Sequence, residues 1–218
     1  MIKQELFLHE EVMLLALRED KGAYIFGARY TLAAGGAILA ELLLAGRVEF
    51  VTERRMMIEA ALFRGQECIA RHHALNDAVL NKGALARIVE IEATVDKQYF
   101  ATFRSDGLII ATPTGSTAYN LSAGGPIVFP TMQAMLMTPI CSHTLTNRPI
   151  LLPGDVTIEI TVKSSNIEDV YLTVDGQVGI PVKAGDRVVV RQSDDVVELV
   201  APVDKSYFNV LRDKLKWG

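Results

Sequence analysis

Cysteine, histidine and runs of basic residues are scarce in this 218-residue sequence, and each scarcity argues against a class of protein. The two cysteines, Cys68 and Cys141, are too few for a disulfide framework. Lysine and arginine form no run and the formal net charge is -4, so we expect no nucleic-acid-binding surface. The adjacent His72 and His73 would point to opposite faces of a strand, and Cys141 has no partners at zinc spacing, so no metal site is predicted.

Signals for targeting and for spanning a membrane are also missing from this sequence. The first residues, MIKQELFLHEEV, lack the basic start and apolar centre of a signal peptide. The most hydrophobic segment, Leu32 to Gly46, is shorter than the roughly 20 residues that a bilayer requires, and it contains Glu41. We therefore expect a cytoplasmic protein in which this segment is a buried core helix, and the pattern argues against a membrane partner.

Hydrophobic residues make up 50% of the sequence and follow two different periodicities. Up to about Gly46 the pattern is helical, with one helix expected over His9 to Asp20. Beyond Val51 apolar and polar residues alternate, as in IVEIEATVD and VTIEITVK, which is typical of half-buried strands. The pattern predicts a mainly β protein with some α: a helical segment in residues 1–50 and a β-sandwich in residues 51–218. A short helix is also predicted around Pro130 to Met137.

The stretch TPTGSTAYNLSAGG, Thr112 to Gly125, follows a short apolar run typical of a buried strand and reads as a possible helix start. Backbone N–H groups freed by glycine, together with the hydroxyls, can bind an anionic or sugar-phosphate ligand. A structural turn that caps a helix would account for the same residues. The stretch is neither a Walker A loop nor G-x-G-x-x-G, and it contains no G-x-S-x-G, so the ligand class stays open here.

Acidic residues at two further places in the sequence are candidates for a site. Asn76 and Asp77 place an amide beside a carboxylate, a pair that can hold the hydroxyls of a ribose and that also occurs in turns and caps. Asp106 lies immediately before the apolar run that leads into the loop, and it could also be a turn residue. Asp175-Gly176 is most simply a hairpin turn.

Several blocks, taken together, resemble the C-terminal domain of bacterial NAD kinases: ERRMMIEAAL, ALNDAVLNKG, RSDGLIIATPTGSTAYNLSAGGPIVFP, ICSHTLTNRPILLPGD, VDGQ and YFNVLRDKLKWG. They occur in the family's order and cover about Val51 to Gly218. The resemblance implies a β-sandwich that carries most of the NAD contacts of an enzyme. That enzyme transfers a phosphoryl group from ATP or polyphosphate, with magnesium, to the 2′-hydroxyl of the adenosine ribose.

The resemblance also implies roles for particular residues toward a bound NAD or NADP. Asn76 and Asp77 match the motif that holds ribose hydroxyls, and Asp106 matches the acid at the nicotinamide end. The remaining matched positions belong to the recognition loop and to a stretch lining the pocket: Thr117, Ala118, Tyr119 and Ser122, then Cys141 and His143. Tyr119 and Ser122 would lie near the adenine and ribose. The family's sandwich domains associate, so a homo-oligomer is implied as well.

The sequence departs from the family in its first part. The family's N-terminal domain carries a Gly-Gly-Asp-Gly motif whose aspartate is the proposed base, whereas Gly35-Gly36 here is followed by Ala37 in an apolar segment. Phosphoryl transfer requires that both substrates be positioned and that charge be stabilised. We therefore expect an acceptor-binding domain that has little kinase activity by itself.

The first part, Leu6 to Phe50, resembles the opening helices of the Golgi phosphoprotein family, which binds phosphoinositide head groups. We interpret the chain as a fusion, natural or engineered, in which two helices cap an NAD kinase sandwich. Any apolar amphipathic helical hairpin would show the same pattern. Two other hypotheses stay open: a non-catalytic oligomerisation module with a vestigial pocket, and a lipid-surface adaptor.

Overall fold

The computed structural model describes residues 36–38, 40–42, 50–83, 88–144, 146–163, 170–202 and 206–217. The chain divides into two compact units, of which one is Glu53–Leu199. The other unit takes in the first 52 residues and those from Val200 onward, which include the C-terminal helix α4 (Tyr207–Leu215).

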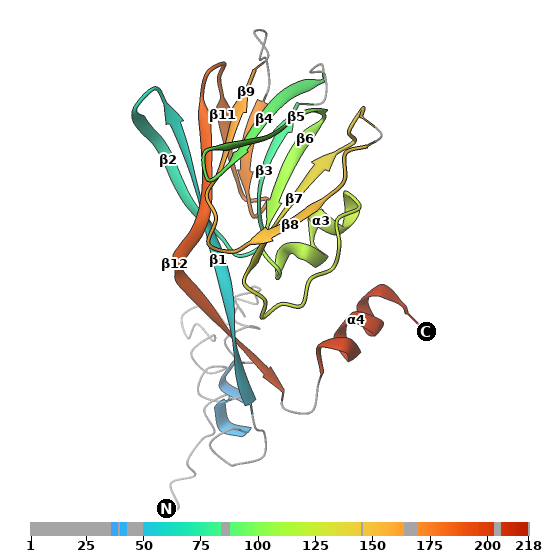
Figure 1. Cartoon of the computed structure of the whole chain (residues 1–218). Coiled ribbons are helices and arrows are strands. Elements are labelled where there is room, and N and C mark those ends of the chain that lie inside the picture. The colour runs from blue at the N-terminus through green and yellow to red at the C-terminus, as the bar shows by residue number, and fades with distance from the viewer. Residues whose placement is uncertain are drawn as a thin grey trace, which may run out of the picture. The chain divides into compact units, whose positions relative to one another are not determined.

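Two six-stranded antiparallel sheets make up most of the described chain (Figure 1). The first has the strand order β2 (Glu67–Ala74), β1 (Phe50–Arg64), β12 (Arg187–Pro202), β9 (Ile158–Val162), β4 (Val89–Val95) and β5 (Gln98–Ser105). The second has the order β11 (Val178–Val182), β10 (Val170–Val174), β3 (Asp77–Lys82), β6 (Gly107–Ala111), β7 (Ala134–Ile140) and β8 (Ile150–Pro153). This architecture confirms the predicted mainly β fold.

A hydrophobic core formed by alternate residues of both sheets holds the sandwich together. In β3, Ala78 and Leu80 belong to this core, together with residues such as Ile58 and Ile91 of the first sheet. The side chains between them along β3 therefore face the opposite side of the second sheet, because successive side chains of a strand alternate. Asp77, Val79 and Asn81 consequently lie on the outer face of that sheet.

A loop that contains two short helices covers part of this outer face. The helices are η1 (Gly115–Thr117) and α3 (Tyr119–Ser122), as expected for a helix start in the glycine- and hydroxyl-rich stretch. Beneath the loop lies a second, smaller apolar cluster: Val79, Ile109, Ala111, Val128, Leu136 and Ile140, with Ala123 packed against it. The loop thereby gives the second sheet a second buried layer.

The prediction of a short helix around Pro130 to Met137 is wrong, because β7 begins at Ala134. All seven residues of β7 are buried. One face of the strand packs in the main core and the other beneath the loop. A strand buried on both faces reads as a continuous apolar run, and such a run has no period-two alternation that separates it from a short helix.

Part of the predicted N-terminal helical segment is described. Residues 36–38 and 40–42 are helical; Ala37 is buried, whereas Ile38 is exposed. The predicted helix over His9 to Asp20 lies outside the described residues. Within the described part of the chain, no helix is long and apolar enough to cross a bilayer.

The C-terminal helix α4 has a well-defined start and end. The Ser206 hydroxyl accepts a hydrogen bond from the Asn209 N–H at 3.3 Å, which is the usual arrangement of a serine N-cap. Lys216, in the left-handed conformation, ends the helix.

Candidate functional site

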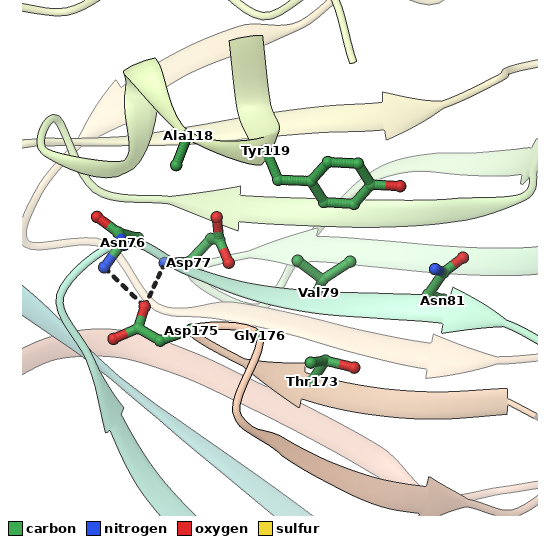
Figure 2. A pocket seen from close by; sticks show the side chains of 9 residues that line it. All are labelled: Asn76, Asp77, Val79, Asn81, Ala118, Tyr119, Thr173, Asp175 and Gly176. Atoms are coloured by element: carbon green, nitrogen blue, oxygen red, sulfur yellow. Dashed lines mark hydrogen bonds between the residues drawn. The ribbon is translucent and has the colours of Figure 1, made fainter. Parts of the chain in front are cut away.

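A cavity of about 330 Å³ lies on the outer face of the second sheet (Figure 2). Residues of β3, of β10 and its following turn, and of the loop around α3 line it: Asn76, Asp77, Val79, Asn81, Ala118, Tyr119, Thr173, Asp175 and Gly176. Four of the predicted site residues, Asn76, Asp77, Ala118 and Tyr119, are therefore brought together from two separate segments of the chain. Figure 2 shows Asp77 and Asn81 at opposite ends of β3, with Val79 between them.

The turn that carries Asn76 and Asp77 is held by the carboxylate of Asp175. The N–H groups of Leu75, Asn76 and Asp77 donate hydrogen bonds of 2.8, 2.8 and 3.0 Å to its two oxygens. Asp175 and Gly176 have φ angles of 48° and 66°, so the predicted hairpin turn between β10 and β11 is confirmed. The Asp175 carboxylate also holds, by hydrogen bonds, a backbone segment about 100 residues earlier in the chain.

The loop is fastened to the same turn through Thr112 and Gly115. The Thr112 N–H donates to the Asn76 carbonyl oxygen at 2.8 Å, and the Thr112 hydroxyl donates to the Leu75 carbonyl oxygen at 2.5 Å. A Cβ atom added at Gly115 would lie 2.0 Å from the carbonyl oxygen of Asn76. The close approach of loop and turn therefore requires glycine at this position.

Two hydroxyl groups of the loop, those of Ser116 and Thr117, bind within the loop itself. The Ser116 hydroxyl donates to the carbonyl oxygen of Pro113 at 2.6 Å and accepts from the Val128 N–H at 3.0 Å. The Thr117 hydroxyl donates to the Thr114 carbonyl oxygen at 3.4 Å. These contacts agree with the structural-turn alternative for the hydroxyls, while Ala118 and Tyr119 are the loop residues that face the cavity.

Asp77 has the most perturbed electrostatics of the site. It is 5% exposed, its carboxylate faces the cavity, and no hydrogen bond from a described residue contributes to its pKa. Burial, together with the neighbouring charge of Asp175, raises the pKa of Asp77 to about 6. A partly desolvated carboxylate that opens to a cavity can accept a hydrogen bond from a ligand hydroxyl there. Asn76, whose amide can both donate and accept, lies beside it.

Other predicted site residues lie outside this cavity lining. Thr117 and Ser122 are exposed on the loop. The remaining three lie at the Lys82 end of β3, where they follow β5 and β7: Asp106, Cys141 and His143. There the Asp106 N–H donates to the Ile140 carbonyl oxygen at 2.9 Å, and an Asp106 oxygen lies 3.5 Å from the Lys82 ammonium. The predicted residues thus form two groups at opposite ends of one strand.

Five lining residues were not predicted from the sequence: Val79, Asn81, Thr173, Asp175 and Gly176. Period-two spacing is a signal that could have found most of them. Asn81 is four residues after Asp77 and shares its face of β3, and Thr173 is two residues before Asp175. β3 and β10 are neighbours, with Val79 opposite Thr173. This pairing depends on the strand order, which period-two spacing does not predict.

A magnesium ion, which the family uses with its phosphate donor, does not fit the donor set of this cavity. Among the described residues that line it, Asp77 and Asp175 are the only carboxylates, and the Asp175 oxygens already accept three backbone N–H groups. Among the described residues, no group of three or more histidine, cysteine, aspartate or glutamate side chains could hold a metal ion.

The two six-stranded sheets, with the glycine-bearing loop over one of them, define a β-sandwich domain. Residues 75–201 match the family model of the ATP-NAD kinase C-terminal domain, and the chain belongs to this family. The match confirms the resemblance inferred from the sequence blocks.

Individual relatives agree with the family assignment. The chain is 56% identical over 168 residues to the NAD kinase of Trichlorobacter lovleyi, covering 77% of this chain and 59% of that protein. It is 52% identical over 170 residues to the NAD kinase of Geotalea daltonii, with 78% and 60% covered. The crystal structure of yeast NADH kinase complexed with NADH superposes with a TM-score of 0.75 at 28% identity, covering 84% of this chain and 55% of that one. The chain spans about 60% of the length of the curated relatives it matches.

A second family model, Golgi phosphoprotein 3 (GPP34), matches residues 8–98. This match confirms the resemblance of the first part of the chain. It also extends beyond residue 50 into strands of both sheets and overlaps the NAD kinase match from residue 75 to residue 98.

Proposed function

We propose that this chain binds NAD or NADP in the cavity along β3 and presents a ribose hydroxyl at the Asn76–Asp77 turn. The observation that carries the proposal is the buried Asp77 carboxylate, which faces the cavity. An ionised carboxylate can accept two O–H hydrogen bonds, and the adjacent amide can complete the recognition of a ribose. Membership of the NAD kinase family supports this choice of ligand.

Each lining residue has a defined part in such binding. Asp77 would accept a ribose hydroxyl, Asn76 would bond a second polar group, and Asp175 would keep their backbone in place through its three N–H contacts. Tyr119 and Val79 would supply an apolar surface for a planar ring. Asp106 remains predicted for the nicotinamide end, and Cys141 and His143 remain predicted for the pocket lining, at the other end of β3.

Phosphoryl transfer by the chain alone should be slow. The 218 residues include no Gly-Gly-Asp-Gly motif, and the described residues that line the cavity do not fit a magnesium ion. General-base assistance contributes about 10²- to 10⁴-fold to a rate, and positioning of the donor contributes more. We therefore propose acceptor binding, with ATP or polyphosphate used only in an assembly that supplies the missing groups.

Binding is tested by calorimetric titration of the whole chain with NAD and with NADP. The double variant Asn76→Ala, Asp77→Ala should weaken binding by roughly 2–4 kcal/mol, because ligand hydroxyls lose their partners. Asp194→Asn, which removes an exposed carboxylate of β12, is the matched control and should bind as the unaltered protein does. Unchanged affinity in the folded double variant would refute the site.

Catalysis is tested by incubating the chain with NAD, magnesium and either ATP or polyphosphate, and measuring NADP with an NADP-specific dehydrogenase. We expect a rate far below that of a complete enzyme. Robust turnover that disappears in Asp106→Asn would contradict the proposal, since it would mean that the sandwich contains its own catalytic base.

A further inference from the structure

Two fully buried polar residues connect the loop to the second sheet. Asn120 lies in α3 and Thr138 in β7, and both have 0% of their surface exposed. The Thr138 hydroxyl donates a hydrogen bond of 2.7 Å to the side-chain oxygen of Asn120. The face of β7 that carries Thr138 otherwise contributes Leu136 and Ile140 to the apolar cluster beneath the loop. Burying two polar groups among apolar side chains is unfavourable unless they are hydrogen-bonded to each other. The Asn120–Thr138 pair therefore favours one position of the loop on the second sheet.

Asn120 also ties together the two ends of the loop. Its amide nitrogen donates to the carbonyl oxygens of Ser116 and Pro126, both at 3.1 Å. A Cβ atom at Gly125 would lie 2.1 Å from the Asn120 side-chain oxygen, so the chain closes tightly around the amide. One side chain therefore links η1, the returning segment of the loop and β7.

The positions of the loop residues that face the cavity depend on the hydrogen bonds of Asn120. Ala118 and Tyr119 immediately precede Asn120 and line the cavity, and Tyr119 is exposed to solvent. Figure 2 shows the Tyr119 side chain over β3, on the side toward which Val79 points. A helix as short as α3 has no stability of its own, because four residues do not repay the cost of helix nucleation. Tertiary contacts must therefore hold Ala118 and Tyr119 in position beside the cavity.

We propose that Asn120 and Thr138 are positioning residues for the ligand: their hydrogen bond fixes Ala118 and Tyr119 over β3 and thereby sets the affinity for the dinucleotide. Neither residue lines the cavity, so their effect is indirect. The affinity part of this inference rests on the proposed function, whereas the fixing of the loop does not.

The test compares Thr138→Val, which removes the hydroxyl at nearly constant shape, with Thr138→Ser, which retains it. Thr161→Val, a change of the same type on β9 of the first sheet, is the matched control. Hydrogen exchange of the amides of residues 115–122 is measured without ligand, and the dissociation constant for NAD is measured by calorimetry. Thr138→Val should speed exchange in the loop and raise the dissociation constant by roughly 5- to 30-fold. Thr138→Ser and the control should behave as the unaltered protein does.

The outcomes separate the two proposals. Unchanged loop exchange in Thr138→Val would overturn the anchoring, and loosened exchange with unchanged affinity would overturn its effect on binding. Failure of the unaltered protein to bind NAD would refute the proposed function and the affinity effect with it, while the exchange data would still decide the anchoring. If Thr138→Val does not fold, Thr138→Cys supplies a weaker donor of similar size and should give a smaller change in the same direction.

Discussion

The carboxyl group of Asp77 opposes folding at neutral pH. Burial and the charge of Asp175 raise its pKa to about 6, whereas an aspartate in an unfolded chain titrates near 4. Between these two values the folded protein binds more protons than the unfolded chain, so stability falls as the pH rises through this window. The cost is complete above about pH 6. A group that reduces stability in this way is expected where it serves binding.

Asp77→Asn should therefore stabilise the protein at neutral pH and leave it nearly unchanged near pH 4. We expect a gain of about 1–3 kcal/mol at neutral pH, because the amide has no charge to desolvate. Urea denaturation at both pH values measures it, with Asp194→Asn as the control. The same variant should lose NAD affinity, and an equal gain at both pH values would show that the raised pKa is not the cause.

Asp186 has the opposite effect on stability. It is 1% exposed and accepts hydrogen bonds of 2.9 and 2.7 Å from the guanidinium of Arg64, and one of 2.8 Å from the Lys183 N–H. Burial acts to raise the pKa of Asp186, but these hydrogen bonds and the nearby positive charges hold that pKa below its usual value. Its stabilisation is therefore present above the pKa of the unfolded chain and is lost as the pH falls through the folded pKa.

Asp186→Asn should destabilise the protein at neutral pH by about 1–3 kcal/mol, since the charge-assisted bonds to Arg64 are lost. The difference from the unaltered protein should shrink below about pH 4, where the unfolded carboxyl is protonated as well. Urea denaturation at neutral and acidic pH measures both values. A difference that does not depend on pH would count against the ion pair as the origin of the effect.

At the scale of elements, the site depends on the contact between the loop and the turn before β3. Gly115 is the point of closest approach, because its backbone lies directly against Asn76. A side chain at this position must push the loop away from β3, and the cavity between them must then widen.

Gly115→Ala should lower the free energy of unfolding by about 1–3 kcal/mol, as overpacking does, and should also weaken NAD binding. Gly179→Ala is the matched control, because a Cβ atom at Gly179 in β11 would have nothing within 4 Å. Thermal unfolding and calorimetry measure the two effects. Equal stability of the two glycine variants would mean that the loop adapts without cost.

For the whole molecule, the exposed side chains of two edge strands lead us to expect self-association. Among the described strands, β5 and β8 lie at the ends of the two sheets. Tyr99 and Phe100 of β5 and Leu151 of β8 are exposed apolar side chains. Unpaired strand edges with apolar side chains are surfaces that a second copy of the chain can cover.

We therefore expect a homo-oligomer at micromolar concentration, measured by light scattering. Tyr99→Lys, which places a charge on the edge of the first sheet, should shift the equilibrium toward smaller species. A monomer at micromolar concentration would contradict the expectation, and an oligomer unaffected by Tyr99→Lys would place the interface elsewhere.

The sequence by itself determined the features that depend on local periodicity and turn chemistry. Alternation in residues 88–96 and 156–163 predicted β4 and β9, and Asp175-Gly176 predicted the hairpin after β10. The order of the sequence blocks indicated the family, and with it Asn76, Asp77, Ala118 and Tyr119 as site residues. These features were readable because each one depends on residues that are close together in the chain or on a recognisable motif.

Only the tertiary structure decided which of these residues share a cavity and what holds them there. The Asp175 carboxylate reaches N–H groups about 100 residues away, and Asn120 meets Thr138 across the face of β7. β7 itself was mistaken for a helix because both of its faces are buried. The reason is the same in each case: strand order and the packing of the loop on the second sheet set these contacts, and local periodicity carries no information about either.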